Sequence, residues 1–221
     1  MNEFNLETLF PIPLMTFDYG KLNDVEKQFI SKCLEDVYPN TYNLTSSDTY
    51  VLDNGLPDIR EFIEKSIRTY AETVIIGGTY DDLGFDFRIT QSWLNKTLRN
   101  SNGHHFHNHP NSYISGVFYT QVNPNADSIY FSKSPTLQDV LKFPIKSHNM
   151  FNSTNLKYDV HEGLLVMFPS TLYHEVKPTH MNMLISEGDN EPFKDRISLS
   201  FNVFPIGNFG NSGDLNELRI Q

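Results

Sequence analysis

The sequence predicts a mainly β protein of the barrel or jelly-roll kind, and three observations support this. From Phe85 onward, apolar and polar residues alternate, which is the period of a half-buried strand. Short strand-like runs then recur between Pro, Asn, Gly and Ser residues, as in many-stranded β folds. The chain also holds 17 Phe and 11 Tyr, and aromatic side chains favour strands.

The elements before this region are predicted to be mainly helical. Residues 8–17 are expected to form an extended edge segment, because proline cannot donate a ladder hydrogen bond. A helix is predicted after Asn23, which can form a capping box with Glu26. A second helix is predicted to begin at Pro57 and to end at Gly77 and Gly78. Strands are expected over 85–95, 113–122, 128–132, 163–168, 172–177 and 196–204.

A chain of 221 residues fits one domain. We expect a single domain over 1–221, with a helical flanking region over 1–80, a β core over 81–205 and a C-terminal tail over 206–221. The polar stretch from Met181 to Lys194 is predicted to be an inserted mobile loop.

Composition excludes several classes of function. The formal net charge is −10 and no cluster of Lys and Arg is present, so nucleic-acid binding is not expected. Cys33 is the only cysteine, which rules out an internal disulfide and favours a reducing compartment. No apolar run has membrane-spanning length and no signal peptide is evident. The sequence therefore predicts a soluble cytoplasmic protein.

Histidines are the strongest functional signal. His104, His105, His107 and His109 lie within six residues, and His174 follows far downstream. Imidazole is the commonest metal ligand, and an H-x-H spacing places two side chains on one face of an extended chain. His107, His109 and His174 are therefore candidate metal ligands that leave coordination positions open. His104 and His105 are expected to be exposed loop residues, and His148, His161 and His180 lack motif context.

A second signal is the strand predicted at 196–203. Its apolar residues face one way, whereas Arg196, Ser198, Ser200 and Asn202 face the other. Such a polar face suits a ligand cavity, in which an arginine binds a carboxylate through two hydrogen bonds. By the same parity, Tyr113 and Tyr119 are candidates for hydrogen bonding an acid. Trp93 is expected to belong to the core.

Together, these segments resemble the 2-oxoglutarate/Fe(II)-dependent oxygenases found in marine bacteria and their phages. The resemblance rests on five segments that cover nearly the whole chain: Leu9-Phe-Pro-Ile-Pro13, Ser92-Trp-Leu-Asn95, His107-Asn-His-Pro-Asn-Ser-Tyr-Ile-Ser-Gly-Val-Phe-Tyr119, Glu162-Gly-Leu-Leu-Val-Met-Phe-Pro-Ser170 with His174, and Arg196-Ile-Ser-Leu-Ser-Phe-Asn202.

The resemblance implies a double-stranded β-helix that binds Fe(II) and 2-oxoglutarate. It implies that His107 and His174 bind the metal and that Arg196 pairs with the remote carboxylate of 2-oxoglutarate. Ser198 and Tyr119 would support that carboxylate, and Asn95 would reach the cosubstrate from a neighbouring strand. Ser198 and Ser200 cannot be separated by parity alone.

One position departs from the wider superfamily, which uses H-x-D/E where this chain has His109. A site of three histidines is chemically reasonable for non-haem iron. An acidic residue from elsewhere is the alternative third ligand, and the candidates are Asp127, Asp159, Glu162 and Glu175.

The predicted function is a dioxygenase that uses O2 and 2-oxoglutarate, releases succinate and CO2, and hydroxylates an unidentified substrate, for which a protein or peptide is one candidate. Two alternatives stay open. One is a cupin-like dioxygenase with three histidines and no 2-oxoglutarate. The other is a non-catalytic jelly-roll binding or structural protein. Assembly as a homodimer also stays open.

Overall fold

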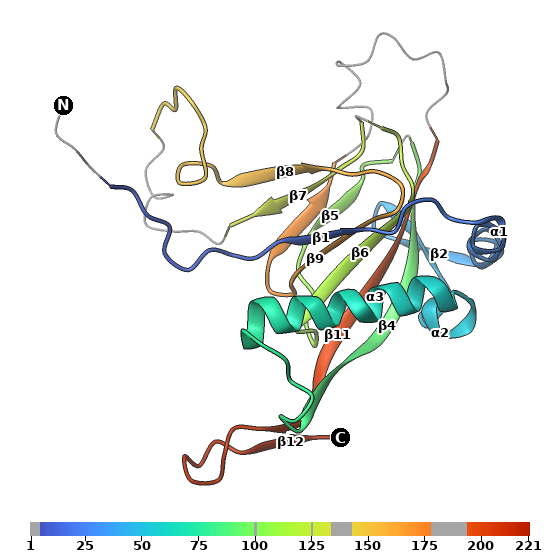
Figure 1. Cartoon of the computed structure of the whole chain (residues 1–221). Helices are drawn as coiled ribbons and strands as arrows, with labels where there is room; N and C mark the ends of the chain where they lie inside the picture. The colour runs from blue at the N-terminus through green and yellow to red at the C-terminus, as the bar shows by residue number, and fades with distance from the viewer. Residues whose placement is uncertain (1–4, 100, 125, 134–142, 178–193) are drawn as a thin grey trace.

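The computed structural model describes residues 5–99, 101–124, 126–133, 143–177 and 194–221. Two antiparallel sheets form its framework (Figure 1). The larger sheet follows the order β1-β9-β6-β11-β4-β3-β2, with β12 added beside β11. Its strands are β1 (Met15–Asp18), β2 (Val37–Asn40), β3 (Asn43–Ser46), β4 (Phe85–Thr97), β6 (Ile114–Gln121), β9 (Leu164–Pro169), β11 (Arg196–Phe209) and β12 (Leu218–Ile220).

The smaller sheet follows the order β5-β10-β7-β8. Its strands are β5 (His104–His107), β7 (Ser128–Ser132), β8 (Asn155–Asp159) and β10 (Tyr173–Val176). Neither β5 nor β8 is expected from the sequence. The first is a run of histidines around one Phe and shows no apolar alternation. The second does alternate, with Leu156 and Tyr158 between polar residues, but only two of its five residues are apolar, so its signal is weak.

Helices cover the outer face of the larger sheet. They are α1 (Asp24–Cys33), α2 (Val51–Gly55), α3 (Pro57–Tyr70) and a π-helical turn (Ala71–Ile76), and Figure 1 shows α3 lying across β11 and β4. The predicted capping box is present, since Asn23 Oδ1 accepts from the Glu26 N–H at 2.9 Å. Gly77, at φ +76°, ends the π-helical turn in the left-handed conformation that glycine tolerates.

Two hydrophobic clusters explain how the layers hold together. The first lies between the helices and the larger sheet, where Ile59 and Ile63 of α3 meet the apolar face of β11. The second joins β6 and β9 to β7 of the smaller sheet, so it lies between the sheets. Successive side chains of β6 point to opposite faces of the sheet, so Phe118 lies in the first cluster and Tyr119 in the second.

The flanking segments contain more strand than the sequence indicates. Residues 1–80, expected to be a helical flank, also supply β1, β2 and β3. Strand β1 follows Pro11 and Pro13 and lies at a sheet edge, as expected for the segment over 8–17. The expected C-terminal tail contains β12, which pairs with the end of β11. Of the predicted loop from Met181 to Lys194, residues 181–193 lie outside the described residues. No helix in the described part of the chain is long and apolar enough to cross a membrane.

Candidate metal centre

Three of the predicted histidines converge at one end of the smaller sheet. His107 of β5 and His174 of β10 are direct partners across the antiparallel pair, and His109 follows β5. One nitrogen from each of the three rings lies within 4.8 Å of the others. The His107 and His109 Nε2 atoms are 3.3 Å apart, and the His107 and His174 ring centroids are 4.3 Å apart. The arrangement can hold one metal ion.

The outer nitrogen of each ring is held by an oxygen. His107 Nδ1 lies 2.7 Å from the His105 carbonyl, and His174 Nδ1 lies 3.1 Å from the Leu172 carbonyl. His109 Nδ1 lies 2.7 Å from Asn202 Oδ1. An oxygen of this kind only accepts, so each Nδ1 carries the proton and each Nε2 keeps a free lone pair. Such partners fix the orientation of metal-binding imidazoles.

Burial keeps these rings neutral. It lowers the pKa of His107 to about 4. It lowers the pKa of His174 well below its usual value, with neighbouring His107 and His109 adding to the effect. Burial also lowers the pKa of His109. Because only neutral imidazole binds a metal, the set is ready to bind one at neutral pH without first losing protons.

No carboxylate joins this cluster among the residues that the structure describes. The Asp127 carboxylate accepts from the Asn123 N–H at 2.7 Å instead. The other three acidic candidates form ion pairs elsewhere: Asp159 with Lys157, Glu162 with Lys27, and Glu175 with Lys177. The geometry therefore supports His109 as the third ligand.

A small cavity of about 40 Å³ extends from the histidines between the sheets. Its wall includes the predicted cosubstrate residues Asn95, Tyr119, Arg196, Ser198 and Ser200. Arg196 is 4% exposed. Its Nη1 donates to the Ser128 carbonyl at 3.2 Å, whereas its Nε has no partner among the described residues. The Tyr119 hydroxyl is likewise buried without a partner.

The structure separates the two serines. Asn95 Nδ2 donates to Ser200 Oγ at 2.9 Å, and Asn95 Oδ1 accepts from Asn43 Nδ2 at 3.0 Å. The Ser200 and Asn95 side chains are thus hydrogen-bonded to each other. Ser198 instead lies opposite Tyr119 in the β11–β6 register. Ser198 is therefore better placed than Ser200 to act together with Tyr119.

A larger cavity of about 390 Å³ opens outside the histidine cluster. Trp93 borders both cavities and its ring centroid lies 5.9 Å from that of His109. The expectation that Trp93 is a core residue is therefore wrong. The rest of the described wall contains no Asp, Glu, Lys or Arg. It consists of Pro110, four histidines and seven residues with hydroxyl or amide side chains: Tyr38, Asn40, Thr45, Thr49, Gln91, Asn108 and Asn202.

Other sequence expectations need correction. Tyr113 is 50% exposed and packs against Phe87, outside the inner cavity. Asn111 adopts φ +56° between His109 and Tyr113, which interrupts the extended register behind the parity argument. His104 is not an exposed loop residue, because it lies in β5 and lines both cavities. His148 is exposed, His161 pairs with Asp18, and His180 lies outside the described residues.

Comparisons with known proteins agree with this geometry. A family model described as "Putative 2OG-Fe(II) oxygenase" matches residues 91–202, just over half of the chain. No curated protein matches the sequence at a significant level.

Three solved structures share the fold. The non-heme alpha ketoglutarate dependent epimerase SnoN from nogalamycin biosynthesis is 10% identical, with a TM-score of 0.52 over 91% of this chain and 82% of its own. The carbocyclase SnoK from the same biosynthesis is 9% identical, with a TM-score of 0.52 over 87% and 79%. HygX from Streptomyces hygroscopicus, solved with nickel and 2-oxoglutarate, is 10% identical, with a TM-score of 0.50 over 87% and 82%. These likenesses confirm the predicted mainly β, jelly-roll fold.

Proposed function

Because the chain belongs to the 2OG-Fe(II) oxygenase family, we propose that His107, His109 and His174 hold its Fe(II) and that Arg196 binds its 2-oxoglutarate. When bound, Fe(II) and 2-oxoglutarate supply oxidative decarboxylation to succinate and CO2, coupled through O2 to oxidation of a substrate C–H bond. The protein contributes orientation, a water-poor pocket and fixed hydrogen-bond donors.

One observation carries the assignment of the cosubstrate site. The Arg196 Nε and Tyr119 Oη atoms are both buried and have no hydrogen-bond partner among the described residues, and their side chains line the same cavity as the histidine triad. Buried polar atoms without partners cost free energy. A dicarboxylate that binds the metal with one end would supply the missing acceptor with its other end. A non-catalytic jelly roll has no need for this arrangement.

The residues around the carboxylate have separate tasks. Arg196 supplies the positive charge and a planar pair of N–H donors. Burial raises the pKa of Tyr119 to about 12, so its hydroxyl remains protonated and donates at neutral pH. Ser198 lies opposite Tyr119 and adds a second hydroxyl. Asn95 holds Ser200 through the 2.9 Å hydrogen bond and so shapes the wall behind the cosubstrate.

We place the primary substrate in the 390 Å³ cavity outside the histidines. Its described wall offers hydroxyl and amide groups but no charged side chain. That wall suits an uncharged substrate with hydrogen-bonding groups, and a peptide segment meets this description. The free Cys33 thiol fits action in a reducing cytoplasm, whether bacterial or that of a phage-infected host.

Thermal melting without oxygen tests the assignment. Mn(II) should raise the melting temperature of the parent protein, and 2-oxoglutarate should raise it further, since a ligand of the folded state stabilises it by mass action. Arg196→Ala should keep the Mn(II) shift and lose the 2-oxoglutarate shift. Arg88→Ala, which removes an exposed arginine of the same sheet, should keep both.

The two alternative functions give different results. A metal shift with no response to 2-oxoglutarate in the parent would indicate a three-histidine dioxygenase of the cupin-like kind. No shift from either ligand would indicate a binding or structural protein.

A further inference from the structure

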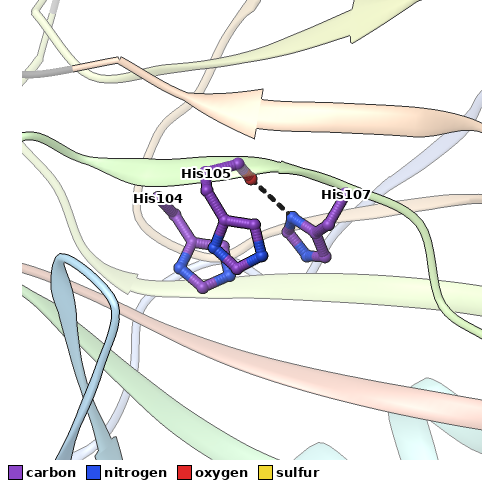
Figure 2. A group of neighbouring side chains, drawn as sticks. All are labelled: His104, His105 and His107. Atoms are coloured by element: carbon purple, nitrogen blue, oxygen red, sulfur yellow. Dashed lines mark hydrogen bonds between the residues drawn. The ribbon is translucent and has the colours of Figure 1, made fainter.

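A second histidine cluster lies beside the triad. One nitrogen each from His104, His105 and His107 lies within 4.8 Å of the others, and their ring centroids are 4.5 to 4.9 Å apart. Figure 2 shows the three rings gathered beside β5. We propose that this cluster is a second position for a divalent transition metal such as Zn²⁺ or Ni²⁺. A metal bound there withdraws His107 from the triad.

An irregularity in strand pairing explains why three nearby imidazoles meet. His107 pairs with His174, whereas His104 pairs with Val176. Three steps along β5 therefore correspond to two steps along β10, which is a bulge. A bulge leaves one residue without an opposite partner and breaks the strict alternation of side chains. The adjacent residues His104 and His105 can consequently bring their rings to within 4.8 Å.

His104 supplies an independent reason to expect a ligand. Its Nδ1 is buried and has no hydrogen-bond partner among the described residues. A polar nitrogen in that state costs free energy, and a bound cation would remove the cost. The neighbouring His105 is exposed and lines the outer cavity. An ion can therefore reach the cluster from solvent without passing through the triad.

His107 makes the two positions compete. Its Nδ1 donates to the His105 carbonyl at 2.7 Å (Figure 2), so only Nε2 keeps a lone pair. That Nε2 lies 3.3 Å from His109 Nε2, inside the triad. One lone pair binds one metal ion, so an ion held with His104 and His105 leaves the triad with two histidines. The competition rests on the proposed triad site, whereas the second cluster itself does not.

The ligand set indicates which metals compete. Three neutral imidazoles suit Zn²⁺, Ni²⁺ and Cu²⁺, which bind nitrogen ligands more tightly than Fe²⁺ does. The described part of the cluster lacks a carboxylate that would favour harder ions. Metals that follow iron in the affinity series should therefore bind the second position more tightly than Fe²⁺ does, and an ion bound there blocks the proposed catalytic one.

Variants that damage only the triad test the second position. His109→Ala and His174→Ala each remove a triad member that the second cluster does not share. We expect each variant to retain about one equivalent of Ni²⁺ in equilibrium dialysis, because three ligands remain. Adding His105→Ala should weaken that binding about tenfold or more, given the usual cost of a disturbed metal shell.

His148→Ala in the same two backgrounds is the matched control, since His148 is exposed and lies outside both clusters. It should leave Ni²⁺ binding unchanged. Far-UV circular dichroism establishes that each variant is folded, and the use of two triad variants guards against the failure of one.

The proposal is overturned if both folded triad variants bind no Ni²⁺. It is equally overturned if His105→Ala leaves their binding unchanged, because the remaining triad histidines would then hold the ion. The proposed triad site is tested separately, by the shift in melting temperature that 2-oxoglutarate causes in the parent protein. Failure of one assignment therefore cannot be mistaken for failure of the other.

Discussion

Asn202 Oδ1 lies 2.7 Å from His109 Nδ1 and fixes the imidazole whose identity distinguishes this chain from the usual H-x-D/E pattern. The contact joins the middle of β11 to the segment after β5, and it leaves His109 Nε2 directed at the cluster. Asn202 would therefore position His109 for the proposed metal ion.

Asn202→Ala should weaken Mn(II) binding about 10- to 100-fold, as loss of the partner of a metal-bound histidine usually does. Calorimetric titration of the metal-free protein measures this. Gln91 pairs with Asn202 in the β4–β11 register and lines only the outer cavity, so Gln91→Ala should bind Mn(II) like the parent. Equal affinity in both variants would show that Asn202 does not position the ligand.

Local periodicity explains what the sequence reveals about this site. Ser198, Ser200 and Asn202 lie on one face of β11 because strand side chains alternate, and Leu199, Phe201 and Val203 are fully buried on the other. Alternation is a property of neighbours in sequence. It can therefore be read directly, without knowing which strand lies alongside.

Features that depend on pairing between distant strands could not be read in this way. The bulge between β5 and β10 places His104 beside both cavities, although its sequence context resembles a polar loop. Trp93 sits in a strand whose two faces carry both polar and apolar residues, so its position beside His109 emerges only from the packed sheets. Asn202 could be placed on the polar face, but its partner could not be identified.

Acidification should destabilise the metal-free protein. The pKa values of His104 and His107 are lowered to about 3 and about 4 in the folded state, whereas an unfolded histidine titrates near 6.5. Between these values the unfolded chain binds protons that the folded chain rejects. The free energy of unfolding should therefore be fully present above about pH 6.5 and should fall as the pH drops toward 4.

Urea unfolding at pH 7.5 and pH 5.5 measures this loss. A His104→Asn/His107→Asn variant should lose less stability between the two pH values, because the groups that bind the extra protons are gone. His148→Asn should lose as much as the parent. The explanation fails if the double variant shows the parent's full loss.

Gly116 should be intolerant of even one added methyl group. A Cβ at this position would lie 2.1 Å from Phe201 Cζ, and Phe201 is fully buried. Gly116→Ala should lower the free energy of unfolding by about 1–3 kcal/mol, the usual cost of overpacking. Gly78→Ala meets no atom within 4 Å and should change it by no more than about 0.5 kcal/mol. Urea unfolding compares the two, and similar stabilities would contradict the close approach of β6 and β11.

Tyr119→Phe should weaken 2-oxoglutarate binding without harming the fold. The Tyr119 hydroxyl is buried and has no hydrogen-bond partner among the described residues, so its removal breaks no hydrogen bond within the described protein. If it donates to the cosubstrate carboxylate, its loss should cost about 1.5–3 kcal/mol of binding, or roughly 10- to 150-fold in affinity. Calorimetric titration of the Mn(II)-loaded protein without oxygen measures the change.

Tyr113→Phe is the matched control for this test, because Tyr113 is half exposed and lies outside the inner cavity. It should keep the parent's affinity for 2-oxoglutarate. Tyr119→Phe should also melt at or slightly above the temperature of the metal-free parent, since an unsatisfied buried hydroxyl is removed. Weaker binding with unchanged stability would assign Tyr119 to the cosubstrate. Lower stability with unchanged binding would instead make it a structural residue of the cluster between the sheets.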